Sequence, residues 1–451
     1  MYLLYSLLLT VGMIILAPLF FIDAFRTRKY ITGLAQRLGK LPPINFHDRP
    51  VIWLHCVSVG ETTAARPLVR ALADRFPSHR LVISTTTITG QRIARDIFGS
   101  EAAAVFYFPI DWAWTVRRVL RVLQPEALLI METELWPRLL YECRARAIPV
   151  ILVNGRISTT SFRRYKFVHT FISRVLDDLS VALMQSEQDA RRIRQLGMAA
   201  ERVMTPGNLK FDSAETATDD GVTDMIRRRF GFDGRQRLIV AASTHAPEER
   251  ILIEAFKRIK SSVRNARLLI APRHPERFDE VASILHESGL AWSRRSKEPR
   301  EQDPSCDVVL LDTVGELRAA YPLADIAFVG GSIASHGGHN VLEPAALGVC
   351  VVTGAHTENF AAVTKALLDE KSIIQLRNLP VSEMSAELAS VLVEFLSNER
   401  QRREIGQRAQ VVCSRNTGAT ERTVQAIAKV LAELPTRETL PLSSLHVTAA
   451  K

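Results

Sequence analysis

The sequence lacks the glycine-rich phosphate motifs of the common nucleotide-binding enzymes. Neither G-x-G-x-x-G at a strand–helix turn nor G-x-x-x-x-G-K-[ST] occurs in its 451 residues. Both motifs wrap backbone N–H groups around the phosphates of a bound nucleotide. Their absence argues against a dinucleotide-dependent redox enzyme and against a P-loop ATPase or GTPase.

Cysteine is scarce, and the usual metal-binding patterns are missing. The five cysteines are widely scattered and form no C-x-x-C pair, which argues against a disulfide framework and a structural zinc site and fits a reducing cytosol. They are Cys56, Cys143, Cys306, Cys350 and Cys413. No H-E-x-x-H, Asp-x-Asp or Asp/His cluster occurs either, so we expect neither a metal nor another cofactor.

Aromatic residues make up only 7% of the chain, and no basic stretch is interleaved with them. A single-stranded nucleic acid would need such stacking platforms. The net charge of +10 nevertheless favours anionic partners. We therefore expect a phospholipid surface or phosphorylated substrates, and no nucleic acid.

Charge is absent from residues 2–22, a stretch long enough to cross a membrane as one helix. Basic residues gather in the following segment, 23–50, which the positive-inside rule places in the cytoplasm. We expect a single-pass anchor at residues 1–22 in the inner membrane, with the catalytic domains on the cytoplasmic side. Pro18 would allow a kinked helix or a shallow insertion instead. A cleaved signal peptide is the other alternative, but the sequence lacks the positively charged start of such peptides.

From Val51 onward, strand-like apolar runs alternate with helical stretches, which is typical of a doubly wound parallel sheet. The pattern predicts an α/β protein with two Rossmann-like domains at 51–212 and 236–434, facing a cleft. A polar linker at 213–235 joins them, and a loose tail follows at 435–451. The predicted strands are 51–57, 81–84, 127–131, 150–153 and 181–184, then 238–242, 267–270, 308–311, 326–329 and 350–353.

The first domain carries acids just after two of its predicted strands. Glu61 follows the first strand beside Gly60, where open α/β sheets bind ligands. As an alternative, Glu61 is an ordinary first-turn acid favoured by the helix dipole. Glu132 and Glu134 follow the strand at 127–131, and either could instead cap the next helix. Lys210, near the end of this domain, could be merely solvated.

In the second domain, the loop at 272–273 offers Arg273 beside His274, which could also be a structural pair. The richest segment is 337–348, whose glycines allow close approach of a phosphate to the backbone. Asn340 and Glu343 stand three apart at the expected start of a helix, and a carboxylate there can grip a ribose diol. A nucleotide-linked donor is the ligand class that fits these loops.

Taken in order, these motifs resemble one enzyme family. They are S-V-G-E, M-E-T-E-L-W-P, N-G-R-I-S, G-N-L-K-F-D, P-R-H-P-E-R-F, V-G-E-L and G-G-H-N-V-L-E-P-A. The string is similar to the 3-deoxy-D-manno-octulosonic acid (Kdo) transferases of lipopolysaccharide synthesis. Those are membrane-anchored, metal-independent, inverting glycosyltransferases with two Rossmann domains, the GT-B fold. The resemblance runs from the N-terminus to about residue 359.

The resemblance implies a reaction and a set of site residues. Kdo would move from CMP-Kdo to a lipid A precursor, lipid IVA, with Glu61 as general base and Glu132 and Lys210 stabilising the transition state. The CMP-binding residues would be Pro272, Arg273, Val314, Gly315, Glu316, Asn340, Val341, Leu342 and Glu343. Gly155, Val314 and Val341 depart from the commoner family residues.

Two rival functions remain open at this stage. One is another nucleotide-sugar enzyme of the same architecture, such as a UDP-sugar transferase or an epimerase. The other is a non-enzymatic scaffold that binds anionic lipid through its basic surface. Arg156, Arg163 and Arg164 could face either the phosphates of the acceptor or the membrane.

Overall fold

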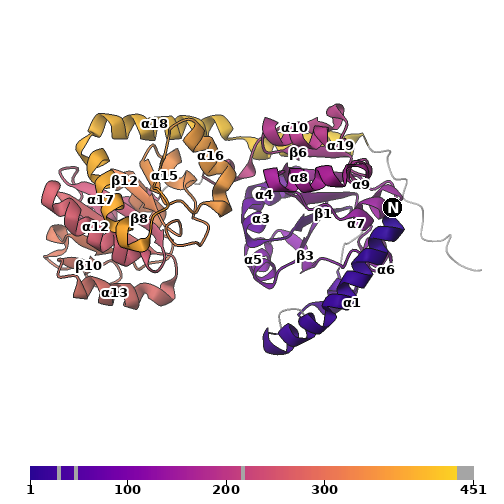
Figure 1. Cartoon of the computed structure of the whole chain (residues 1–451), viewed down its shortest axis with the longest axis horizontal. Coiled ribbons are helices and arrows are strands. Elements are labelled where there is room, and N and C mark those ends of the chain that lie inside the picture. Colours follow the sequence, from indigo (N-terminus) through magenta and orange to yellow (C-terminus); the bar gives the residue numbers. More distant parts are fainter. Residues whose placement is uncertain (28–31, 45–48, 215–218, 434–451) are drawn as a thin grey trace, which may run out of the picture. The chain divides into compact units, whose positions relative to one another are not determined.

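The computed structural model describes residues 1–27, 32–44, 49–214 and 219–433, without the side chains of 17–27 and 213–214. The chain divides into two compact units (Figure 1). Unit 1 contains Met1–Leu209 and the stretch from Gly418 onward, and unit 2 contains Lys210–Thr417.

Unit 1 is built on a seven-stranded parallel sheet in the order β3-β2-β1-β4-β5-β6-β7. Its strands are β1 (Val51–Cys56), β2 (Arg80–Thr85), β3 (Ala102–Tyr107), β4 (Ala127–Met131), β5 (Val150–Gly155), β6 (Val181–Met184) and β7 (Val203–Met204). Every residue of β1, β4 and β5 is buried, as expected of strands covered on both faces.

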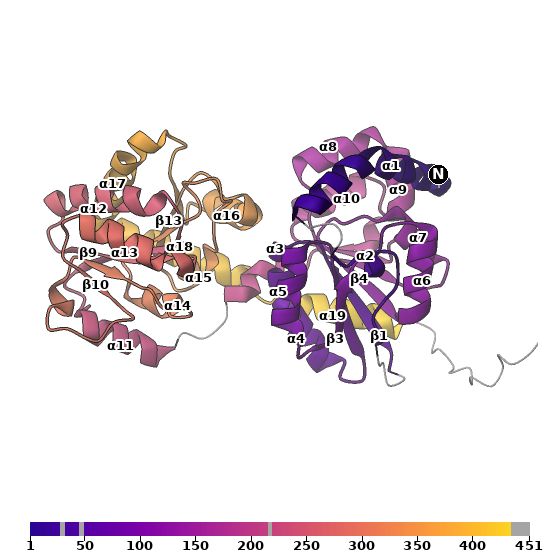
Figure 2. The same ribbon diagram turned by 90° about the horizontal axis from the view of Figure 1, so that it is seen from below.

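Helices cover both faces of this sheet. One core contains Trp53, Leu128 and residues of α6 (Ala113–Leu123), α7 (Pro137–Arg144), α9 (His169–Leu176) and α10 (Glu187–Gln195). The opposite core contains Leu54, Leu129 and residues of α3 (Val59–Ala64), α4 (Arg66–Arg75), α5 (Ile88–Phe98) and α19 (Ala419–Ala432). Because alternate residues of a strand point to opposite faces, Trp53 and Leu54 enter different cores. Figure 2 shows α3, α4 and α5 together.

Unit 2 repeats the plan with a second seven-stranded parallel sheet, in the order β10-β11-β9-β8-β12-β13-β14. The strands are β8 (Arg237–Thr244), β9 (Ala266–Pro272), β10 (Trp292–Arg294), β11 (Val308–Leu310), β12 (Ile326–Val329), β13 (Cys350–Thr353) and β14 (Ile374–Gln375). The helices are α11 (Asp220–Phe230), α12 (Glu248–Ser262), α13 (Phe278–Glu287), α14 (Leu317–Ala320), α15 (Leu342–Ala346), α16 (Ala361–Asp369), α17 (Val381–Ser397) and α18 (Glu399–Asn416).

Both sheets have a topological switch point. In unit 1 the chain runs outward from β1 in one direction and from β4 in the other, so β1 and β4 are neighbours with opposite continuations. In unit 2 the pair is β8 and β12. Ligands of open α/β sheets bind outside the carboxyl ends of such strand pairs.

The structure differs from the sequence-based expectations in two parts of the domain division. The segment expected to link the domains, 213–235, contains α11, whose Ile226 and Phe230 lie in a core of unit 2. The helical stretch that closes the domain expected at 236–434 is broken at Thr417–Gly418, where Gly418 has a φ of +83°. Its second half, α19, packs on α4 in unit 1.

The N-terminal helix α1 (Tyr2–Thr27) packs against unit 1 through two tyrosines. Tyr2 donates a hydrogen bond to Asp178, and the ring of Tyr5 stacks on Phe171 with centroids 6.1 Å apart. Helix α2 (Leu34–Arg37) and, later in the unit, α8 (Thr159–Phe167) complete its described helices. Within the described residues, no helix combines the length and the apolar character that crossing a membrane requires. The anchor expected at 1–22 extends into residues whose side chains are not described, and it finds no support in the rest.

Candidate functional site

In unit 1, the chemistry-bearing residues follow the two strands of the switch point. Glu61 comes after β1, and Glu132 comes directly after β4, so the sheet brings the two acids to one edge. Their charges interact, because the Glu132 carboxylate contributes to the raised pKa of Glu61. This is the edge at which a ligand of an open parallel sheet binds.

Glu61 occupies the first turn of α3 and closes a capping arrangement with Ser58. The Ser58 Oγ accepts from the N–H of Glu61 at 3.4 Å and donates to the Glu61 Oε1 at 2.8 Å. The Val57 N–H donates to the Glu61 Oε2 at 2.8 Å. In its hydrogen bonds, Glu61 is therefore an ordinary acid of a first helical turn, which was the alternative prediction for this residue. Gly60 lies inside α3 and has no left-handed φ, so the end of β1 does not depend on the conformational freedom of this glycine.

The Glu61 carboxyl group is nonetheless unusual, because only 6% of the residue is exposed. Burial, opposed by the Val57 N–H and reinforced by the carboxylates of Glu132 and Glu134, raises the pKa of Glu61 to about 7. A helix dipole alone would favour the ionised form of a first-turn acid, and the pKa shift of Glu61 runs the other way. A carboxyl with a pKa near neutrality is well matched to taking up a proton at physiological pH.

Glu132 sits on a strained backbone, with a φ of +54°. A non-glycine residue in this left-handed region carries a conformational cost, and such residues gather at functional sites. The N-cap residue of α7 is Trp136, and the Asp111 carboxylate accepts from the N–H groups of Arg138 and Leu139 in its first turn, at 2.9 and 2.8 Å. Burial raises the pKa of Glu134, with Glu132 adding to the shift.

Asn154 at the end of β5 is a site candidate that the sequence reasoning missed. It is buried, has a φ of +55°, and its Oδ1 accepts from the Leu209 N–H at 3.0 Å. Its Nδ2 has no hydrogen-bond partner among the described residues. Because a buried unpaired donor is costly, it suits a ligand oxygen. Asn154 begins the motif N-G-R-I-S, but only the structure shows that its side-chain N–H group lacks a partner among the described residues.

In unit 2, the residues proposed to bind the donor follow neighbouring strands of the second sheet. Pro272 ends β9 and is buried, whereas Arg273 is exposed and anchored by its N–H to the Thr244 carbonyl at 3.0 Å. Glu343 and Arg273 interact electrostatically. The sheet order β11-β9-β8-β12-β13 brings the corresponding loops to one edge.

Four histidines that the sequence reasoning did not assign gather at this edge. The ring of His245, after β8, stacks on those of His336 and His339 and meets that of His274 edge to face. The Nε2 atoms of His245 and His339 are 2.7 Å apart, so one ring donates to the other. Burial and the neighbouring imidazoles lower the pKa of both to about 4, which leaves them neutral at pH 7.

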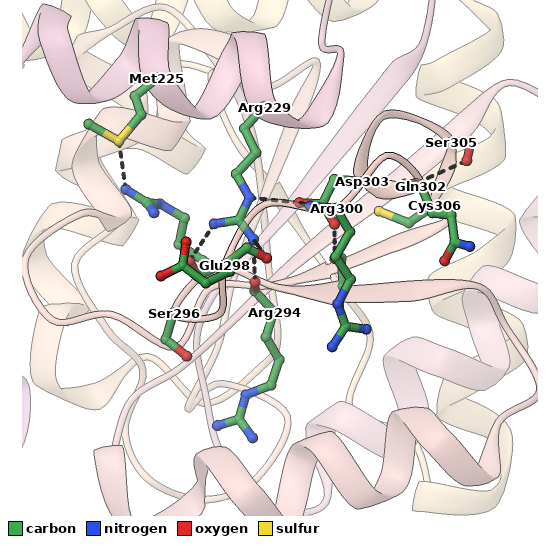
Figure 3. Close-up of polar contacts among 12 residues, drawn as sticks. Met225, Arg229, Arg294, Ser296, Glu298, Arg300, Gln302, Asp303, Ser305 and Cys306 are labelled. Atoms are coloured by element: carbon green, nitrogen blue, oxygen red, sulfur yellow. Dashed lines mark hydrogen bonds and ion pairs between the residues drawn. The ribbon is translucent and has the colours of Figure 1, made fainter.

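The predicted Val314–Gly315–Glu316 loop follows β11. Val314 is 81% exposed, Gly315 has a φ of +92°, and Glu316 is paired with Arg295 at 2.9 Å. Figure 3 shows how the segment that carries Arg295 is held. The Arg229 guanidinium pairs with Asp303 at 2.8 Å and donates to the carbonyls of Arg294 and Arg295 at 3.0 and 2.7 Å.

The segment after β12, from Gly330 to Glu343, is rich in glycine and carries the remaining predicted residues; we call it the glycine-rich segment. The Asn340 Nδ2 donates to the Glu343 Oε1 at 3.1 Å, while its Oδ1 accepts from the Leu342 N–H at 3.1 Å. Burial raises the pKa of Glu343, opposed by Asn340. Val341 and Leu342 are buried. A helix does begin here as expected, but α15 is short, with only five residues.

Lys210 belongs to unit 2, although the sequence reasoning placed it at the end of the first domain. Its Nζ donates to the Asn359 carbonyl at 3.2 Å and lies 5.5 Å from the centroid of the Phe360 ring. Asn359 in turn donates its side-chain N–H to the carbonyls of His336 and Gly338. Lys210 is thus tied to the glycine-rich segment that carries Asn340 and Glu343.

The predicted site residues therefore form two sets. Glu61 and Glu132 share one edge of the sheet in unit 1, and the other predicted residues gather with Lys210 in unit 2. In the described parts of the chain, no three His, Cys, Asp or Glu side chains are placed to hold a metal ion. A cavity of about 540 Å³ lies at the opposite edge of the second sheet, among the starts of β8 and β13, and contains none of the predicted residues.

Comparison with known proteins gives a consistent picture. Residues 32–213 match the family described as 3-deoxy-D-manno-octulosonic-acid transferase (kdotransferase). The chain is 32% identical to the 3-deoxy-D-manno-octulosonic acid transferase of Haemophilus influenzae over 407 residues, 90% of this chain and 93% of that one. It is 34% identical to the corresponding transferase of Bordetella pertussis over 384 residues, 83% of this chain and 86% of that one.

Solved structures support the architecture. The UDP-GlcNAc 2-epimerase of Neisseria meningitidis, bound to UDP-GlcNAc, superposes with a TM-score of 0.54 at 10% identity, covering 84% of this chain and all of that one. At such low identity the likeness shows the fold alone, which is two α/β units of the GT-B type. The alignments with the two transferases cover most of their length and show the family. The chain belongs to the 3-deoxy-D-manno-octulosonic acid transferase family of glycosyltransferases.

Proposed function

We propose that the protein transfers Kdo from CMP-Kdo to a hydroxyl of a lipid A precursor, lipid IVA, with inversion at the anomeric carbon. One observation carries this proposal. Glu61 presents a buried carboxyl group with a pKa of about 7 at the switch point of the first sheet. A base in that place can deprotonate an acceptor hydroxyl at physiological pH.

Inversion requires a single displacement. The acceptor oxygen forms a bond to the anomeric carbon while the bond to the phosphate oxygen of CMP breaks, and the hydroxyl proton passes to Glu61. Ser58 and the Val57 N–H fix the two carboxyl oxygens, so the base is oriented before the acceptor arrives. Orientation of this kind lowers the entropic part of the barrier.

Residues of unit 2 would bind the leaving group. Arg273 and the backbone of the glycine-rich segment would offer the donor phosphate positive charge and N–H groups, and Glu343 would accept from a ribose hydroxyl. Lys210 lies beside the same segment, where a cation stabilises the charge that develops on CMP. Glu316, held by Arg295, completes the donor set.

Glu132 would act next to Glu61 in unit 1, by supporting the positive charge that develops on the sugar. Its strained φ and its charge interaction with Glu61 support a role at this edge. Arg156, Arg163 and Arg164 remain candidates for the phosphates of the acceptor. Arg163 and Arg164 are exposed on α8, whereas Arg156 is half-buried.

The decisive variant is Glu61→Gln, which keeps the size of the side chain and removes the base. We expect turnover to fall by about 10²- to 10⁴-fold, the usual worth of general-base help. The measurement is product formation by mass spectrometry with purified protein, CMP-Kdo and lipid IVA. The control is Asp96→Asn, an exposed acid on α5. Near-normal turnover in Glu61→Gln would remove Glu61 from the mechanism.

The alternative is another nucleotide-sugar transferase or an epimerase of GT-B architecture. The donor nucleotide separates the two. We expect CMP to raise the melting temperature of the protein and UDP to leave it unchanged. The reverse result would favour the alternative. No effect of either nucleotide, together with no transferase activity in the wild type or in Glu61→Gln, would favour a lipid-binding scaffold.

We further propose that α1 attaches the enzyme to the cytoplasmic face of the inner membrane. Its described part exposes a row of large apolar residues, including Leu3 at 81%, Ile14 at 67% and Ile15 at 68%. An apolar helix face of this kind binds the boundary of a bilayer. The test is sedimentation with vesicles that contain anionic phospholipid. Leu7→Glu combined with Ile14→Glu should release the protein, and unchanged binding would refute this attachment.

A further inference from the structure

The glycine-rich segment, Gly330 to Glu343, has a defined backbone conformation, although glycine residues make such a segment intrinsically flexible. The Gly338 N–H donates to the Gly331 carbonyl at 2.8 Å, and the His339 N–H donates to the Gly330 carbonyl at 3.2 Å. Gly331 and Gly338 have φ angles of +67° and +73°. Glycine in such conformations gives up much chain entropy when it is fixed. Something must therefore hold this segment in place.

Glu248, in the first turn of α12, supplies that hold. The residue has no exposed surface, and its carboxylate accepts four backbone N–H groups. Its Oε2 accepts from His245 at 3.0 Å and Gly331 at 2.8 Å, while its Oε1 accepts from Ser332 and Ile333 at 2.9 Å each. One side chain thus ties the end of β8 to the start of the glycine-rich segment.

This arrangement is specific to a carboxylate. No ion pair of Glu248 occurs among the described residues, so the four backbone N–H groups are what oppose the rise in pKa that burial causes. The fit is also tight, since a Cβ on Gly330 would come within 2.6 Å of the Glu248 Oε2. The site is satisfied and closed, and it offers nothing to a ligand directly.

The other end of the same segment faces the proposed donor site. It carries Asn340 and Glu343, and Asn359 connects it to Lys210. The backbone N–H of His245 donates to Glu248, and the ring of the same residue contacts His339 within the segment. Movement at Gly331 would therefore be passed to the donor-binding residues.

We propose that Glu248 is a positioning residue, whose buried carboxylate fixes the backbone of Gly331–Ile333 and so shapes the glycine-rich segment for CMP. The inference rests on the proposed function, because it takes CMP as the ligand of this edge. Glu248 touches no substrate. It acts on donor affinity through the backbone alone.

The test is Glu248→Gln in the full-length protein. The amide keeps the size but turns an NH₂ group toward two N–H donors, which pushes the segment away. We expect the Kd for CMP, measured by calorimetry, to rise at least tenfold. The KM for CMP-Kdo should rise with it, while the KM for the lipid acceptor stays unchanged.

Asp325→Asn is the matched control. Asp325 lies at the starts of β8 and β12, the two strands whose opposite ends Glu248 connects. It accepts from Arg237, the Leu238 N–H and Arg402. Its loss should lower the melting temperature comparably and leave the Kd for CMP unchanged. An unchanged Kd in Glu248→Gln, or equal weakening in Asp325→Asn, would overturn the proposal.

Two further readouts keep the outcomes distinct. If Glu248→Gln does not fold, hydrogen exchange of the wild type tests the proposal instead. The amides of Gly331, Ser332 and Ile333, which donate to Glu248, should then exchange slowly even without ligand. Rapid exchange there would contradict the proposal. If the wild type binds CMP and Glu248→Gln binds it equally well, only this inference fails. If the wild type does not bind CMP, the proposed donor fails, and this inference fails with it.

Discussion

At the scale of single residues, burial decides what the Glu61 carboxyl group can do. The sequence places an acid after a buried strand, and that position was predicted correctly. Its hydrogen bonds are those of an ordinary capping residue. The difference lies in the 6% exposure and the neighbouring acids, which raise its pKa to about 7. Neither property can be predicted from a local pattern, because both depend on how β1 and β4 meet.

Ser58→Ala tests this environment. The Ser58 hydroxyl lowers the pKa of Glu61, so its removal should raise that pKa further. Because the base is active when ionised, the acid limb of the pH–rate profile should move to higher pH, and the alkaline plateau should fall because Oε1 of Glu61 loses its Ser58 partner. Loss of the helix cap should also cost about 1 kcal/mol of stability. Thr63→Ala, which loses an exposed hydroxyl on the same helix, is the control. A limb that moves to lower pH would contradict the assignment.

Lys210→Gln tests the proposed cation of the donor side. Loss of one group that stabilises developing negative charge typically costs about 10²- to 10³-fold in kcat. We expect a fall of that order, measured at saturating donor. Lys365→Gln removes an exposed lysine of the same unit, paired only with Asp369 among the described residues, and should have no effect. Equal kcat values for the two variants would exclude Lys210 from the reaction.

At the scale of elements, well-buried strands were predictable, including the three-residue β11, and four short or partly exposed strands were not. Strands β4, β6, β12 and β13 have the bounds that the apolar runs indicated. Strands β3, β7, β10 and β14 were missed. β7 and β14 have two residues each and β10 has three, too few for a periodic signal, while β3 begins with alanines and is only partly buried.

The loops at the ends of the strands show the same limit. Their composition indicated a ligand site, but not which residues support which. Glu248 gave no signal, because an acid in a first helical turn is ordinary. The four backbone N–H groups that it accepts come from loops more than eighty positions away as well as from its own turn. Contacts of that kind depend on the sheet order, which a single sequence does not fix.

Gly330→Ala tests how tightly the loops after β8 and β12 are packed. The new methyl group would meet the Ser243 carbonyl at 2.8 Å and the Thr244 Cα at 2.9 Å, both backbone atoms. We expect a loss of about 1–3 kcal/mol, as for other overpacked positions, measured by denaturant unfolding. Gly221→Ala, whose nearest contact is the side chain of Asp219, should cost less. An equal cost for the two substitutions would contradict the packing.

At the scale of the whole molecule, the chain crosses between its units twice. It leaves unit 1 after Leu209 and returns at Gly418, so α19 completes a core of unit 1. The alternation of strands and helices predicted two Rossmann-like units, but not this return, because α19 has the same amphipathic pattern wherever it packs. Ala419, Val424 and Ile427 are buried there.

Deleting α19 should therefore damage the unit from which it is most distant in sequence. A chain that ends at residue 416 should lose several kcal/mol in unit 1, since burial of each large aliphatic side chain contributes about 1.5–3 kcal/mol. A chain that ends at residue 433 is the control and should be unaffected. Hydrogen exchange resolves the units, and the faster exchange should appear in residues 51–209. Faster exchange confined to unit 2 would contradict the observed packing.

The central claim is that one carboxyl group, Glu61, takes the proton from the acceptor. The pH dependence of kcat/KM for Kdo transfer tests it most directly. The account predicts a wild-type rate that rises with pH through a half-point near 7, the pKa of Glu61, and then levels off. Glu61→Gln should be slower by about 10²-fold or more at the plateau and should lack this limb. The same limb in Glu61→Gln as in the wild type would show that another group is the base.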